Sequence, residues 1–160
     1  MTDPLLASAR EVLRRTRADM RASIEGIPPD ALNWRPAGND TNSIAVLATH
    51  SLTSTRWWLS VAVDAPIPDR DRPTEFEASA RDAGELLALT GGLFEDCLSL
   101  VDGSRTVDWA AVRSDPDAEQ DQQFPAAWAV LHALQHIREH EGQMSLTRQL
   151  WERRAAERHA

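Results

Sequence analysis

Histidine is the residue type whose positions in this sequence point most directly to chemistry. His132, His136 and His140 are spaced four residues apart. In an α-helix, residues at this spacing have Cβ atoms about 5–6 Å apart, which lets two imidazoles bind one metal ion. His50 lies far from them in the sequence, and His159 lies beside the C-terminus. We assign no role to His159 and treat the other four as candidate functional residues.

The histidines fall on apolar faces of two predicted helices. At about 100° per residue, His50 shares a face with apolar residues of its segment, and His132, His136 and His140 form one stripe of another. A buried imidazole without a hydrogen-bond partner or a metal costs on the order of 1–3 kcal/mol. A shared cation satisfies two or three imidazoles together. We therefore predict one divalent metal ion bound by His50, His136 and His140.

Each histidine also has a simpler interpretation. His50 alone is typical of a hydrogen-bonded core histidine, and a pair such as His136 and His140 often lies on a plain helix surface. We rank His132 below the other three, as a residue that supports a ligand, lines a pocket or forms a core hydrogen bond.

Three neutral imidazoles leave coordination positions open for water or substrate, which is typical of catalytic rather than structural metal sites. The ion would lower the pKa of a bound water, polarise a carbonyl group or activate a thiolate. Hydrolysis would need a general base. Glu139, about 60° round the helix from His136, is a candidate base, a carboxylate that orients a ligand or a solvated side chain. Cys97 falls in an apolar pattern and is predicted to be inert, so a reacting thiol would come from outside the chain.

Four long amphipathic segments are predicted to position these residues. They span residues 4–25, 43–64, 74–101 and 125–154, and Thr74 with Glu77 has the form of a capping box at the start of the third. A polar connection over residues 102–123 includes a predicted helical turn near Trp109. No segment alternates with period two, so we expect no sheet of consequence. The simplest way to bury four such stripes is an all-α four-helix bundle, formed as a single domain over residues 1–160.

Two further residue types are candidates for function. Trp57 and Trp128 are predicted to lie close to the histidine faces, where they either line a pocket or pack in the core. Trp57 and Trp58 are adjacent, so we expect one of them to serve an interface. Arg35 is either an anion-binding residue or, as is more common, a helix-end or salt-bridge residue.

Charge and hydropathy exclude some classes of protein. The formal net charge of −8 disfavours contact with a nucleic-acid backbone. No apolar run approaches the roughly 20 residues that a membrane span needs. The N-terminal residues lack the features of a signal peptide, so we expect a cytoplasmic protein.

Several short motifs, in this order and spacing, resemble the DinB/YfiT-like superfamily over roughly residues 5–152. They are Asn33-Trp34-Arg35-Pro36, Asn42-Ser43-Ile44-Ala45 before His50, His136-x-x-x-His140-x-Gly142-Gln143, and Arg148-Gln149-Leu150-Trp151.

The resemblance implies a four-helix bundle, often dimeric, with a divalent ion on His50, His136 and His140. It implies zinc or nickel most often, and Gln143 as part of the signature after the last ligand. It also implies a small-molecule substrate and either of two activities, metal-dependent hydrolysis or S-transfer with a low-molecular-weight thiol such as mycothiol or bacillithiol. A metal-binding or ligand-binding bundle without catalysis is the alternative.

Overall fold

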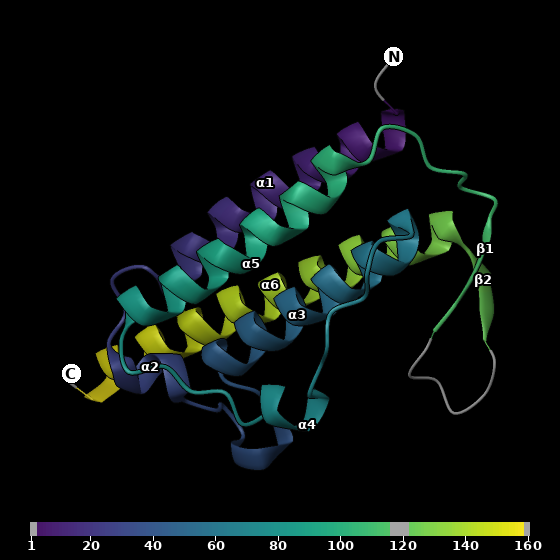
Figure 1. The fold of residues 1–160 in the computed structure, drawn as a ribbon. Coiled ribbons are helices and arrows are strands. Elements are labelled where there is room, and N and C mark those ends of the chain that lie inside the picture. The colour runs from purple at the N-terminus through teal and green to yellow at the C-terminus, as the bar shows by residue number, and fades with distance from the viewer. Residues whose placement is uncertain (1–2, 116–121, 159–160) are drawn as a thin grey trace.

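Four long helices form the body of the protein. The computed structural model describes residues 3–115 and 122–158. The long helices are α1 (Pro4–Ile24), α3 (Ile44–Val63), α5 (Ala83–Gly103) and α6 (Ala126–Arg158), and α1 and α3 each pack against both α5 and α6 (Figure 1). The predicted all-α four-helix bundle is confirmed. None of the described helices combines the length and apolar character needed to cross a membrane.

Short elements fill the connections. These are α2 (Pro29–Asn33), the 3₁₀ helix η1 (Gly38–Asp40), α4 (Arg72–Glu75), β1 (Val112–Ser114) and β2 (Gln123–Pro125). The two strands pair antiparallel in a small ladder, which lies on the connection from α5 to α6 at one side of the bundle. Near Trp109 the chain makes a hydrogen-bonded turn, in which the Ala111 amide donates to Asp108 O at 3.0 Å. Residues 116–121 of the predicted polar connection lie outside the described residues, as does His159.

The core is built from the apolar stripes of the four long helices. On α6, Leu134, Ile137 and Met144 lie off the histidine stripe and form a second apolar side, which is also buried. The largest side chains that are at most 1% exposed include Leu13, Met20, Leu52, Leu59, Phe94, Ile137 and Met144. This core fixes the faces of α3 and α6 that meet each other.

The predicted start of the third long helix at Thr74 is wrong. Thr74 belongs to the short helix α4, where its hydroxyl donates to Asp71 Oδ2 at 2.6 Å. The helix α5 begins at Ala83. Asp82 caps this helix, since its side chain accepts a hydrogen bond from the Glu85 amide at 2.8 Å. Both sites have a capping residue followed three residues later by glutamate, but only the second precedes the long apolar stripe of α5.

The directions of the helices explain the separate α4. The helices α3 and α5 run the same way, opposite to α1 and α6 (Figure 1). Because α3 ends at the end of the bundle opposite to where α5 begins, residues 64–82 must return along the bundle. This crossover connection carries α4 past the side of α3.

The Asn-Trp-Arg motif holds the crossover connection in place. Asn33 and Ala80 exchange two hydrogen bonds, of 2.7 and 3.0 Å, through the Asn33 side chain and the Ala80 backbone. Arg35 donates to the carbonyl oxygens of Phe76 at 2.8 Å and Thr41 at 3.4 Å. Arg35 is therefore a structural residue rather than the anion-binding residue that the sequence left open.

Candidate metal centre

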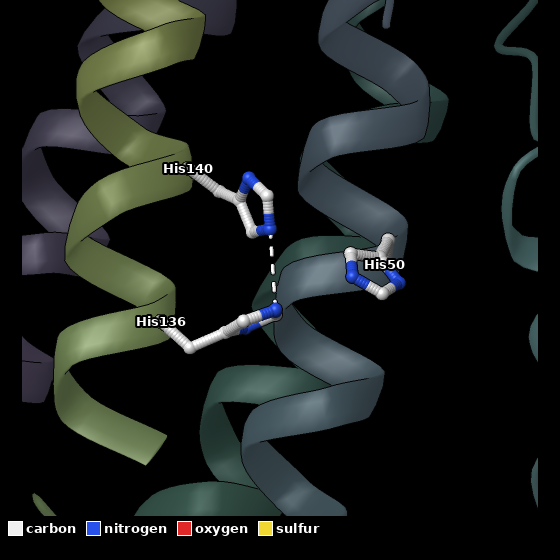
Figure 2. A group of neighbouring side chains, drawn as sticks. All are labelled: His50, His136 and His140. Atoms are coloured by element: carbon white, nitrogen blue, oxygen red, sulfur yellow. Dashed lines mark hydrogen bonds between the residues drawn. The ribbon is translucent and has the colours of Figure 1, made fainter. Parts of the chain in front are cut away.

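The histidines predicted as metal ligands come together between two antiparallel helices. His50 projects from α3, and His136 and His140 project from α6 one turn apart (Figure 2). One nitrogen of each ring lies within 4.8 Å of the others. The Nε2 atoms of His136 and His140 are 3.2 Å apart. Two helices that are distant in the sequence thus place three imidazole rings around one point.

The donor set fits a divalent cation. Burial, together with the nearby charge of His140, lowers the pKa of His136 to about 3. Burial also lowers the pKa of His140, against the opposing effect of its hydrogen bond to Gln143. Both rings are therefore neutral at pH 7, which is the form that binds metal. The ring of His136 faces His140 through Nε2, while its buried Nδ1 has no hydrogen-bond partner.

His50 is held by a carboxylate from the crossover connection. The Nδ1 atom of His50 lies 2.8 Å from Oε2 of Glu75, which is only 6% exposed. Burial alone would raise the pKa of Glu75, but hydrogen bonds from His50, Arg70 and Thr53 outweigh it and lower the pKa to about 2. An ionised carboxylate accepts hydrogen bonds only. We therefore place the ring proton of His50 on Nδ1, which leaves the lone pair of Nε2 for a metal.

Gln143 acts on His140 in a similar way. The Nδ1 atom of His140 lies 2.8 Å from Oε1 of Gln143, three residues later on α6. When the amide oxygen accepts this hydrogen bond, His140 carries its proton on Nδ1 and presents Nε2. This contact gives Gln143 a physical role in orienting an imidazole, which the sequence alone did not show.

His132 lies beside the cluster, among aromatic side chains. Its ring stacks on Trp128 at 4.8 Å between centroids and 6° between planes, and its centroid is 6.0 Å from that of His136. Trp58 contacts the same ring at 4.7 Å. These contacts place His132 in a group of packed aromatic rings next to the cluster, and they do not decide among its three interpretations.

The expectation that one of the adjacent tryptophans serves an interface is wrong. Trp57 is 3% exposed and packs in the core, which is one of its two predicted roles, whereas Trp58 contacts Trp128 and His132. Both tryptophans are buried within the bundle, so neither presents an open face for an interface.

Two other predicted residues stay outside the cluster. Glu139 is exposed, and its charge raises the pKa of His140 against the larger effect of burial. Cys97 is fully buried, and burial raises the pKa of its thiol to about 12, so it is the inert core residue that the sequence predicts.

A pocket of about 320 Å³ adjoins the cluster at the next turn of the same two helices. It includes Leu47, one turn before His50 on α3, and Gln143, which contacts His140. Its other lining residues are Pro36, Asp40, Thr41, Asn42, Leu146, Thr147 and Leu150. The pocket therefore combines apolar walls with oxygen and amide groups, and none of these lining residues is basic.

Comparison with known proteins agrees with this architecture. The family model of the DinB superfamily matches residues 12–144. A conserved protein from Enterococcus faecalis, known from its crystal structure, superposes with a TM-score of 0.72 at 16% sequence identity, covering 94% of this chain and 97% of that one. At this identity the likeness concerns the fold alone. A search of curated proteins found no match to the chain. Since the family model matches most of its length, the chain belongs to the DinB superfamily.

Proposed function

We propose that this protein is a metal-dependent enzyme in which His50, His136 and His140 bind one divalent ion, zinc or nickel. The observation that carries the proposal is the convergence of three imidazole nitrogens within 4.8 Å. The neutral state of His136 supports it further. Histidine-only ligation suits both metals.

Three protein ligands would leave room for a small-molecule substrate. Tetrahedral zinc has four ligands, so three histidines leave one position open. The pocket beside Gln143 could hold the rest of the substrate against Leu47 and Leu150. When bound, the ion would supply Lewis acidity at that open position.

Transfer of an external thiol is the reaction that the surrounding residues support best. In the described parts of the chain, the group of side chains within metal-binding reach of each other contains no carboxylate. Glu75 already accepts hydrogen bonds from Arg70 and His50, so it is a poor general base. A bound metal would lower the pKa of a thiol, so that solvent water could take up the proton and no such base would be needed. Because Cys97 is buried, we propose a low-molecular-weight thiol as the cosubstrate.

The test compares thiol transfer with hydrolysis in one preparation. Protein stripped with a chelator is loaded with zinc or nickel and mixed with a chromogenic electrophile, with and without a panel of low-molecular-weight thiols. We expect turnover that requires both metal and thiol, and its loss in the triple variant His50→Ala, His136→Ala, His140→Ala. A chromogenic ester is assayed in parallel without thiol.

The other outcomes separate the remaining functions. Ester cleavage without thiol would replace thiol transfer by hydrolysis. Stoichiometric metal binding with neither activity would indicate a non-catalytic metal-binding or ligand-binding bundle. Equal metal content in the triple variant and the wild type would contradict the metal site itself.

We also propose a cytoplasmic homodimer with no nucleic-acid partner. Exposed apolar side chains on α6 support the dimer, since Trp128, Leu131 and Leu146 are 45%, 56% and 54% exposed. The net charge of −8 argues against nucleic acid. Light scattering coupled to size-exclusion chromatography is expected to give twice the chain mass of 17.8 kDa, and a monomer at micromolar concentration would contradict the dimer.

A further inference from the structure

A buried ionic group lies behind His50, on the opposite side of the ring from His136 and His140. Glu75 accepts hydrogen bonds from Arg70 at both carboxylate oxygens, at 2.7 Å from Nε and 2.9 Å from Nη2. The oxygen bonded by Nη2 also lies 2.8 Å from Nδ1 of His50. The side chains of His50, Glu75 and Arg70 are 7%, 6% and 12% exposed. All three are thus removed from solvent.

Stability alone does not account for such a group. A buried ion pair gains little net free energy, because the desolvation of both charges offsets their attraction, and apolar side chains of similar size often serve as well. Here the pair lies on the crossover connection rather than in the bundle core. Its carboxylate is directed at a nitrogen of a proposed metal ligand.

The contacts leave His50 little freedom. Because both oxygens of Glu75 accept from Arg70, the carboxylate is fixed in position and accepts from His50 as well. The centroid of the Phe76 ring lies 4.5 Å from that of the His50 ring, so Phe76 restricts rotation of the imidazole. Protonation of Nδ1 and restriction of the ring together direct Nε2 toward the other two histidines.

We propose that Glu75, held by Arg70, is a positioning residue that fixes the tautomer and orientation of His50 and thereby sets the metal affinity of the site. This inference rests on the proposed metal site. A carboxylate behind a ligand imidazole also makes the imidazole a stronger donor. The crossover connection is then part of the metal site, although it supplies none of the three ligands.

The first experiment measures zinc affinity by competition with a chromophoric chelator. We expect Glu75→Ala to bind zinc about 10- to 100-fold more weakly, the range typical for loss of such a partner. Glu75→Gln should lose less, since its amide oxygen can still accept from Nδ1 of His50. Glu77→Gln, an exposed position on the same connection, is the matched control and should bind as the wild type does.

A second variant guards against misfolding. Glu75→Ala strands the buried Arg70, so Arg70→Met with Glu75→Leu removes both charges together. We expect this double variant to keep its circular dichroism spectrum and its cooperative unfolding, yet to bind zinc about 10- to 100-fold more weakly. Wild-type affinity in either folded variant would overturn the inference.

The tautomer is measured on the metal-free protein, so this readout does not depend on bound metal. Nitrogen-15 NMR of the imidazole rings is expected to show His50 protonated at Nδ1, and a shift toward the Nε2–H form in the double variant. An unchanged tautomer there would overturn the positioning role while leaving the metal site intact. If the triple histidine variant instead keeps its zinc, the proposed function fails, and with it the effect of Glu75 on affinity.

Discussion

Alanine at either His136 or His140 is expected to weaken binding of zinc or nickel by more than about 100-fold, beyond the loss typical for residues that only support a ligand. Each substitution removes one of three nitrogens that lie within 4.8 Å of each other. The remaining two histidines would hold the ion with fewer bonds. Isothermal titration of chelator-treated protein with each metal provides the measurement.

His132→Ala is the matched control for these substitutions. His132 lies on the same stripe of α6, but its ring stacks on Trp128 and lies outside the three-histidine cluster. We expect metal affinity to stay within about threefold of the wild type, well below the cost of losing a supporting residue. Equal losses from His132→Ala and His136→Ala would contradict the assignment of ligands.

The second large effect is on stability at mildly acidic pH. The metal-free protein is expected to lose stability as the pH falls from 7 to 5, because folding keeps His136 neutral. The pKa of His136 drops from its ordinary value of 6.5 to about 3, through burial and the charges of His140, His50, His132 and Arg70. Below pH 6.5 the unfolded chain therefore binds a proton that the folded chain does not, and the free energy of unfolding decreases.

The size of this effect follows from the pH interval. One unit of pKa difference corresponds to about 1.4 kcal/mol. Because pH 5 lies only about 1.5 units below the pKa of the unfolded chain, protonation of one such group lowers the free energy of unfolding by at most about 2 kcal/mol. His136 is partly exposed, and solvent screening reduces the expected loss to about 1–2 kcal/mol. His140 shifts in the same direction. Urea unfolding at several pH values, without metal, gives the measurement.

The double variant His136→Gln, His140→Gln provides the comparison. Its glutamines do not titrate, so the free energy of unfolding should fall less steeply between pH 7 and 5. Parallel curves for the wild type and this variant would show that other groups cause the acid sensitivity.

Much of the bundle could be predicted from periodicity. The apolar stripes located three of the four long helices to within a few residues, because helix faces repeat regularly along a chain. The third helix was the exception. Residues 74–77 have the same local pattern as residues 82–85, but the structure places them on the crossover connection, which Asn33 and Arg35 bond at Ala80 and Phe76.

The histidine cluster could be predicted for a related reason. Spacing on one helix brings His136 and His140 together, and an inward position on another helix makes His50 the natural third member. Glu75 could not be found in this way, since nothing in the spacing of positions 50 and 75 connects them. Their contact depends on the path of residues 64–82 along the bundle, which is a property of the tertiary structure.

The presence of Trp58, rather than Trp57, beside His132 also depends on the tertiary structure. Two adjacent helical residues differ by about 100° in direction, and the helix face alone does not show which neighbours each will meet. Trp58 meets Trp128 and His132 because of how α3 and α6 pack. Local patterns thus identified the candidate ligands, while the residues around them follow from packing.

Anomalous diffraction from crystals grown with zinc would show whether three histidines hold one divalent ion. We expect one strong peak, about 2.0–2.1 Å from a nitrogen of each of His50, His136 and His140, as zinc–histidine bonds require. A peak bound only by surface carboxylates, or one shared by His136 and His140 without His50, would contradict it.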